Sequence, residues 1–66
     1  MNWDTVKGNW KHTKGLIKEK WGELTDDDLT RAEGRKDQLI GRIQERYGRT
    51  REAAEREVDH WLKSLH

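Results

Sequence analysis

Among the side chains that could hold a metal ion, three consecutive acidic residues and three histidines are the first candidates. They are Asp26, Asp27 and Asp28, and His12, His60 and His66. A calcium loop spreads its oxygen ligands over about twelve residues around a central glycine and closes with a glutamate, and this pattern is missing here. The histidines do not stand in an HxH or HxxxH spacing, so we predict no zinc site and no metal. The acidic run is better explained as the first turn of a helix, where carboxylates stabilise free backbone N–H groups.

Sequence signatures of catalysis are also missing. The chain has no cysteine, its glycines form neither GxGxxG nor GxxxxGK[ST], and no serine or threonine stands in a recognisable nucleophile motif. We therefore expect a protein that is not an enzyme, that uses no cofactor and that has no small-molecule substrate.

One basic stripe has the residue types and spacing of an anion-binding face. Lys7, Lys11, Lys14 and Lys18 recur every three or four residues, and two tryptophans lie close to them in sequence. Such a helix face could follow the phosphates of nucleic acid or an anionic membrane surface. The alternative, which we prefer, is a solvated face that complements acids on a neighbouring helix. With 14 basic and 13 acidic residues, the chain is expected to bind either partner only weakly.

The elements that must position these residues are helices. The chain has no proline, and no useful length of it alternates between apolar and polar residues. Apolar positions instead recur every three or four residues in three stripes. The stripes are Trp3, Val6, Trp10, Thr13, Ile17, Trp21 and Leu24; Leu29, Ala32, Lys36, Leu39, Ile40, Ile43 and Tyr47; and Ala54, Val58, Trp61, Leu62 and Leu65. Short connections predict an all-α bundle of three helices, or of four if the first is broken near Gly8 or Gly15.

Capping residues mark the expected ends of these helices. The starts are predicted at Asn2 or Asp4, at Thr25 and at Thr50, and the first two ends at Gly22 and Gly48. Thr25 and Asp28 have the spacing of a capping box. Three acid-first pairs spaced by four residues are expected to form ion pairs: Glu45 with Arg49, Glu52 with Arg56, and Asp59 with Lys63.

The chain also repeats itself. GLIKEKWG at 15–22 and GRIQERYG at 41–48 stand 26 positions apart, and the match extends upstream to Gly8 and Gly34. We interpret residues 1–66 as one small helical domain with repeated segments 8–22 and 34–48. Glycines seven residues apart line nearly one face of a helix, here the face away from the apolar stripe.

Interior glycines destabilise a helix by about 1 kcal/mol each relative to alanine, so this pattern needs an explanation. Three were weighed. A duplicated helical unit carried its glycines along, with Gly22 and Gly48 as helix ends. Alternatively, the glycines let another backbone approach closely, within this chain or from a second copy. A third explanation is that they keep the helices soft, so that folding depends on a partner, a surface or water activity.

Composition sets the remaining limits. Charged residues make up 41% of the chain and apolar residues 30%, so a domain of 66 residues is expected to be marginally stable. The sequence has no apolar run long enough for a membrane span, and MNWDTVKGNW lacks the apolar region of a signal peptide. We therefore expect a cytoplasmic protein.

Three segments together carry a family resemblance: NWK at 9–11, KGLIKEKWGELTDDD at 14–28 and EGRKDQLIGRIQERYG at 33–48. They resemble the CsbD-like family of small bacterial general-stress proteins, in particular its enterobacterial YjbJ-type members, over nearly the whole chain. The resemblance implies a small cytoplasmic helical bundle that is made abundantly under general stress. The family is known by its regulation rather than by an activity, so the resemblance implies no catalytic or ligand-binding residues.

The leading functional expectation is a non-enzymatic, protective stress-response protein, similar to a hydrophilin, which shields other macromolecules through weak multivalent contacts. Its mean hydropathy of -1.33 and its mixed charges motivate this expectation. One alternative is a binding module that contacts nucleic acid or anionic membrane through the lysine-rich face. Another is self-association through the glycine faces, with a monomer or a weak oligomer expected. The sequence identifies no partner.

Overall fold

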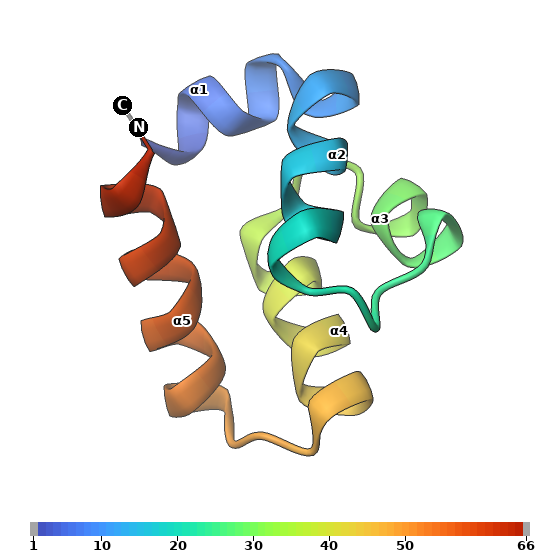
Figure 1. Cartoon of the computed structure of the whole chain (residues 1–66), viewed down its shortest axis with the longest axis vertical. Coiled ribbons are helices and arrows are strands. Elements are labelled where there is room, and N and C mark those ends of the chain that lie inside the picture. Colours follow the sequence, from blue (N-terminus) through green and yellow to red (C-terminus); the bar gives the residue numbers. More distant parts are fainter. Residues whose placement is uncertain (1, 66) are drawn as a thin grey trace.

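The computed structural model describes residues 2–65, which form five helices and no strand (Figure 1). The helices are α1 (Trp3–Gly8), α2 (Trp10–Lys20), α3 (Asp26–Ala32), α4 (Lys36–Tyr47) and α5 (Arg51–Ser64). In Figure 1, α5 runs back alongside α4, α1 crosses one end of the molecule, and α3 lies at the side opposite α5. The all-α prediction is confirmed.

The predicted apolar stripes build the core. Their fully or nearly fully buried members come from all five helices and from the connection after α2: Val6, Ile17, Trp21, Leu24, Leu29, Ala32, Leu39, Ile40, Ile43, Ala54, Val58, Trp61 and Leu62. Trp21 packs edge to face on Trp61 with ring centroids 5.6 Å apart. This contact joins the end of α2 to α5, and an aromatic pair of this kind contributes about 1 kcal/mol beyond its buried area.

The first predicted helix is broken near Gly8, as the sequence allowed. α1 ends at Gly8, and α2 begins at Trp10 after Asn9, whose backbone is not helical (φ -127°, ψ 44°). Asn2 caps α1 by accepting a hydrogen bond from the Thr5 backbone N–H at 2.9 Å. Gly15 therefore remains inside an unbroken helix.

The second predicted helix is also broken, which the sequence did not indicate. α3 ends at Ala32, and α4 starts only at Lys36, because Glu33 (φ 49°) and Gly34 (φ 77°) both adopt left-handed backbone conformations. The Trp3 indole N–H donates to the Gly34 carbonyl at 2.8 Å, so α1 holds this turn in place. The expectation of one continuous helix from residue 25 to 48 was wrong.

The two long helices that follow the breaks match the spacing of the repeat. α2 begins at Trp10 and α4 at Lys36, 26 positions apart, and each follows a short helix and a break. The repeated phrases thus occupy α2 and α4 together with the residues immediately after them.

The predicted caps are mostly present. Thr25 and Asp28 form the reciprocal capping box of α3, Thr50 caps α5, and Gly48 (φ 63°) ends α4 in a left-handed conformation. The end of α2 differs from the prediction. Trp21 is its C-cap, with a backbone that is not helical (φ -120°, ψ 81°), and Gly22 lies in the following turn, while the Trp21 side chain is buried in the core.

The acid-first ion pairs expected along single helices are replaced by other pairs among the described residues. Arg49 pairs with Glu57, and Lys36 of α4 pairs with Asp59 of α5 at 2.7 Å. Glu45 pairs with Arg42 at 3.3 Å instead of Arg49, and Glu52–Arg56 does not form. Lys36 thus reaches an acid on a neighbouring helix, which the spacing along one helix does not reveal.

Candidate functional site

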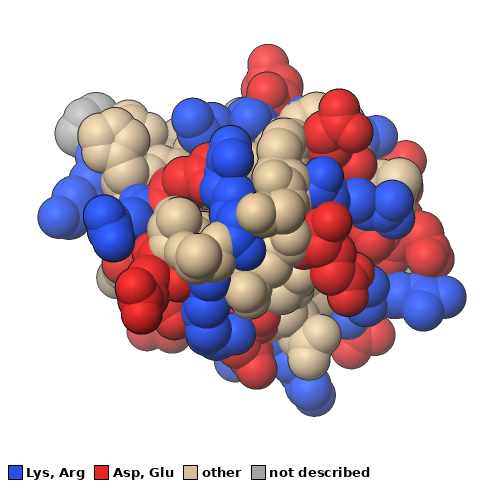
Figure 2. Space-filling model, turned by 90° about the horizontal axis from the view of Figure 1, so that it is seen from below, with Lys and Arg blue, Asp and Glu red and all other residues tan. Residues whose placement is uncertain are grey.

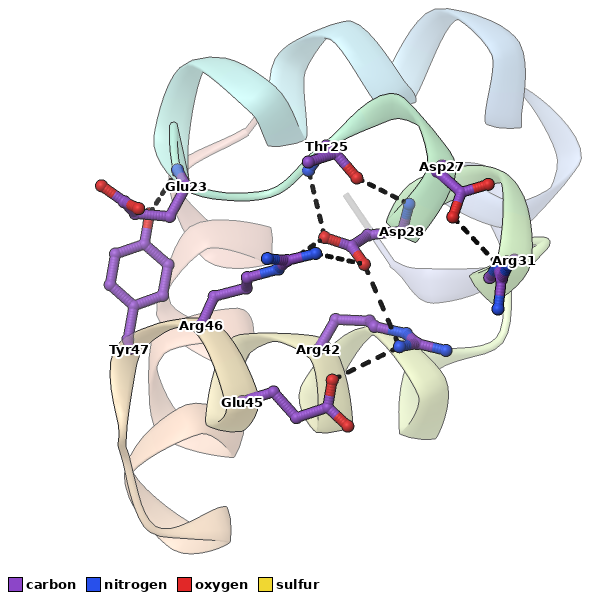
Figure 3. A network of polar contacts seen from close by, with 9 residues as sticks. All are labelled: Glu23, Thr25, Asp27, Asp28, Arg31, Arg42, Glu45, Arg46 and Tyr47. Atoms are coloured by element: carbon purple, nitrogen blue, oxygen red, sulfur yellow. Dashed lines mark hydrogen bonds and ion pairs between the residues drawn. The ribbon is translucent and has the colours of Figure 1, made fainter.

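Asp28 is the only charged residue within 2–65 that is buried, with 3% of its surface exposed. Figure 3 shows its carboxylate pointing toward Arg42 and Arg46 of α4. Its Oδ2 accepts hydrogen bonds from the Thr25 backbone N–H at 3.1 Å and from Arg46 Nε at 2.9 Å. Its Oδ1 accepts from Arg46 Nη2 at 3.3 Å and lies 3.9 Å from Arg42 Nη1. One carboxylate on α3 thus holds two arginines of α4.

The charge of Asp28 is stabilised by these donors. The hydrogen bond from the Arg46 guanidinium lowers the pKa of Asp28 from its ordinary value of 3.8, burial acts in the opposite direction, and the Thr25 backbone N–H lowers the pKa further. Because both carboxylate oxygens already face donors of this chain, Asp28 serves to join α3 to α4.

Tyr47 makes a second link beside this network. Its hydroxyl oxygen accepts a hydrogen bond from the Glu23 backbone N–H at 3.0 Å, and the Arg49 guanidinium lies 5.0 Å from the centre of its ring. Figure 3 shows Tyr47 reaching from the end of α4 to the connection between α2 and α3. The capping interaction of Asp28 with Thr25 was predicted from the sequence, but neither the Tyr47 link nor the contacts of Asp28 with Arg42 and Arg46 were.

The other acids and the histidines do not form a metal site. Asp26 and Asp27 are exposed in the first turn of α3, where they pair with Lys18 and Arg31. His12 lies exposed on α2 and His60 exposed on α5, while His66 lies outside the described residues. Within residues 2–65, no three histidine, aspartate or glutamate side chains gather as metal ligands would.

The lysines predicted to share one face are divided by the structure. Lys18 pairs with Asp26 of α3 at 3.1 Å, so this residue complements a neighbouring acid. Lys11 and Lys14 line one shallow depression, together with Trp10, Thr30 and Glu33. Lys7 lies on α1, beyond the break, and lines an adjoining groove that shares Glu33. Within residues 2–65, Lys7, Lys11 and Lys14 form no ion pair.

Two half-buried tryptophans line the same two depressions, Trp3 the one with Lys7 and Trp10 the one with Lys11 and Lys14. The Trp3 and Trp10 ring centroids are 6.0 Å apart, with the ring planes inclined by 57°. Trp10 donates its indole N–H to the Leu29 carbonyl at 3.0 Å, as Trp3 does to the Gly34 carbonyl. Both rings are therefore fixed to the segment that contains the end of α3 and the turn after it.

The groove beside Lys7 has a volume of about 780 Å³ and carries charges of both signs. Its walls come from α1, the turn after α3, α4 and α5, and they include two ion pairs, Lys36–Asp59 and Arg51–Glu55. Asp4, Glu33 and Asp37 add acids, while Lys7 and Arg35 add bases. Because neither sign dominates, the groove alone does not select an anion or a cation.

The glycines have mostly open surroundings. A Cβ atom placed on Gly8, Gly15, Gly22, Gly41 or Gly48 would meet no other group within 4 Å. Gly34 is the exception, since its Cβ would lie 3.2 Å from Lys7 Cγ. Close approach within the same chain therefore does not explain five of the six glycines, whereas Gly34 lies against Lys7, whose Cα would be 3.6 Å from the added Cβ.

Comparison with known proteins places this architecture in a family. The sequence profile of the family described as CsbD-like matches residues 4–56, which is most of the chain. The chain belongs to the CsbD-like family. This is a family of bacterial general stress-response proteins, as the sequence resemblance implied.

Individual CsbD-like relatives match almost from end to end. A UPF0337 protein of Pectobacterium atrosepticum is 67% identical over 61 residues, which cover 92% of this chain and 88% of the relative. The UPF0337 protein YjbJ of Escherichia coli K12 is 59% identical over the same shares of the two chains. A UPF0337 protein of Pseudomonas aeruginosa is 57% identical over 88% of this chain and 89% of its own.

Proposed function

We propose that this CsbD-like protein is a non-enzymatic, cytoplasmic protein of the stress response that protects other macromolecules by shielding them. Shielding here means many weak and exchangeable contacts made by the whole surface, in the manner of a hydrophilin. The observation that carries the proposal is the distribution of charge. Figure 2 shows basic and acidic side chains interspersed over the displayed face, with other residues between them.

The ion pairs on this surface are suited to exchange. Arg31–Asp27 and Arg51–Glu55 each expose about half or more of both side chains, and Lys18–Asp26 is comparably open. Exposed pairs of this kind contribute about 0–1 kcal/mol, so opening one to contact a client costs the fold little. A mixed surface also avoids the large single-sign field that would drive strong, selective binding.

None of the helices within residues 2–65 is long and apolar enough to cross a bilayer. Shielding of many clients requires solubility at high concentration, which a mean hydropathy of -1.33 favours.

Protection of a client enzyme tests the proposal. The enzyme is dried or heated with an equimolar amount of this protein, and its recovered activity is compared with that obtained with an inert protein of similar mass. We expect a clear excess of recovered activity over the inert protein. Equal recovery in both samples would eliminate shielding as the function.

A second candidate is anion binding through Lys7, Lys11, Lys14 and Lys18, with nucleic acid or anionic membrane as the partner. The absence of ion pairs at the first three, within the described residues, favours it, and the Lys18–Asp26 pair argues against including the fourth. Titration against DNA and against anionic vesicles at rising salt tests this candidate. Binding that is lost as salt rises supports it, and no binding at low salt eliminates it.

For the oligomeric state we propose a monomer with at most weak self-association through the exposed glycine faces. Gly8, Gly15 and Gly22 are exposed with open space above them, so a second copy could approach there. Sedimentation at increasing concentration tests this, because a stable dimer at micromolar protein would contradict it.

A further inference from the structure

Two indole rings and three lysines form one continuous surface at the end of the molecule where α1 meets α2. We call this surface the tryptophan–lysine platform: Trp3, Lys7, Trp10, Lys11 and Lys14. Its continuity follows from the 6.0 Å separation of the two rings and from the two adjoining depressions, which share Glu33. It is therefore a surface of flat apolar rings flanked by ammonium groups.

The two rings are held rigidly. Each indole N–H is already bonded to a backbone carbonyl, Trp3 to Gly34 and Trp10 to Leu29, so neither ring turns freely. What each ring leaves to a partner is part of its hydrocarbon face, since both side chains are half-buried. A fixed aromatic face is suited to stacking on a flat base, because the ring loses little further freedom on binding.

The lysines have no internal role that uses their charge. The aliphatic part of Lys7 packs on Gly34, but its ammonium group forms no ion pair within residues 2–65, and neither do those of Lys11 and Lys14. The tryptophan hydrogen bonds already hold α1 and α2 to the end of α3 and the turn after it, so the lysine charges are not needed for that contact. Proteins hold single-stranded nucleic acid with this arrangement of free ammonium groups beside fixed rings. The phosphates contact the basic side chains, and the nucleobases stack on the aromatic rings.

A membrane surface is less suitable as the partner. A helix that lies in a bilayer interface must turn its apolar face toward the lipid. The apolar face of α2 is already in the core, where Thr13 and Ile17 are buried. Duplex DNA is also less suitable, because its bases are stacked on each other and are not offered to the two rings.

We propose that the tryptophan–lysine platform binds single-stranded nucleic acid, with bases against its two rings and phosphates at its three lysines. This inference rests on the second candidate function above and narrows its ligand to one class. Binding is weak, because Glu33 places a carboxylate between the depressions that Lys7, Lys11 and Lys14 line.

The test is a titration of a labelled single strand of about 12 nucleotides, a length within the usual range of single-strand sites. Fluorescence anisotropy reports binding, and quenching of tryptophan fluorescence reports stacking. The comparison ligands are an abasic strand of the same length, the matching duplex and anionic vesicles. We expect the single strand to bind most tightly and to quench the tryptophans, and the abasic strand to bind without quenching.

Matched variants locate the site. Lys11→Gln/Lys14→Gln removes two platform charges, and Lys20→Gln/Lys63→Gln removes two exposed charges that line a different depression. The platform variant is expected to weaken binding about tenfold. It should also reduce the slope of log affinity against log salt concentration by about 0.7 for each lysine removed. The control variant is expected to change the affinity by less than about twofold. Glu33→Gln is expected to strengthen binding two- to fivefold, on the order of the energy of one exposed charge contact.

Three results would overturn the proposal. One is equal affinity for the abasic strand with equal quenching, which would leave no role for the rings. Another is an equal loss in the two lysine variants, which would place the strand elsewhere or nowhere in particular. The third is binding to vesicles without binding to the strand, which would reject this inference and leave anion binding as a function. The client-protection assay is independent of all three.

Discussion

At the scale of single residues, Asp28 joins two helices through one buried carboxylate. Its carboxylate completes the capping box of α3, and it also receives the guanidinium of Arg46 from α4. A charged hydrogen bond of this kind stabilises more than a neutral one, and a missing partner leaves a buried group unsatisfied. The contact is therefore more sensitive to substitution than the exposed ion pairs around it.

Substitution of Asp28 by asparagine is expected to destabilise the fold by about 2 kcal/mol, from the lost capping interaction and the lost charged hydrogen bonds. Urea unfolding followed by circular dichroism measures this. Asp27→Asn is the matched control, since Asp27 sits in the same helical turn but is exposed and pairs with Arg31 on the helix surface. The control is expected to change stability by less than about 0.5 kcal/mol. Equal losses in both variants would show that the buried network has no special role.

The same residue predicts the response to acid. The pKa of Asp28 is lowered in the folded state, so its contribution to stability is present above the ordinary value of 3.8 and is lost as pH falls through the folded pKa. Unfolding midpoints measured from neutral to strongly acidic pH should therefore fall steeply for the wild type below that ordinary value. Asp28→Asn should show a shallower decline, and parallel curves would contradict this assignment.

At the scale of helices and turns, the sequence predicted local features well and contacts distant in sequence poorly. The apolar stripes and the caps at Thr25, Thr50 and Gly48 depend on neighbours within one or two turns, and all are present. The break after α3 depends on Trp3, which is 31 positions away from the Gly34 carbonyl that it holds. Gly34 stands two residues after Ala32, where a glycine often ends a helix. The apolar stripe continues regularly on both sides of Gly34, so the sequence pattern did not reveal the break.

In the candidate sites, too, local features were predictable from the sequence and contacts distant in sequence were not. The lysine stripe was visible in the sequence because its spacing is helical, but the division of Lys18 from the others requires knowledge that α3 lies beside α2. The contacts of Asp28 with Arg46 cross 18 positions and join two helices, so no periodicity reveals them. Asp28 did offer a signal, since it lies four residues before the buried Ala32 and so shares its helix face.

For the turn after α3, we expect two substitutions to change the stability of the fold in opposite directions. Glu33→Gly should stabilise the fold by about 1 kcal/mol, because glycine adopts the left-handed conformation without the strain of a side chain. Gly34→Ala should destabilise it, because the new Cβ is strained at a φ of 77° and would press on Lys7 at 3.2 Å. Thermal unfolding of both variants measures the difference. Changes of the same sign would mean that the turn is not held in this conformation.

The two glycines inside long helices yield the next prediction. Gly15 lies in α2 and Gly41 in α4, each with open space where a Cβ would stand. Gly15→Ala and Gly41→Ala should therefore stabilise the protein by about 1 kcal/mol each. Urea unfolding of the single and double variants measures this. Destabilisation in a monomer would mean that these faces are in close contact after all.

At the scale of the whole molecule, a small core supports a large charged surface. The core needs the Trp21–Trp61 pair and the buried residues of all five helices, while most ion pairs lie in solvent and exchange readily. A domain of this size is expected to be marginally stable, and its helix-interior glycines lower stability further. In the proposed function the surface makes the protective contacts with clients. A variant with a more stable fold should therefore protect clients as well as the wild type does.

The most direct measurement of this claim is client protection by the stabilised variant. The recovered activity of a dried client enzyme is compared among wild type, Gly15→Ala/Gly41→Ala and an inert protein of similar mass at equal molar ratio. The account predicts that wild type and variant protect equally well and both exceed the inert protein. A variant that protects less than wild type would mean that softness of the fold is what protects, and recovery no better than with the inert protein would contradict shielding altogether.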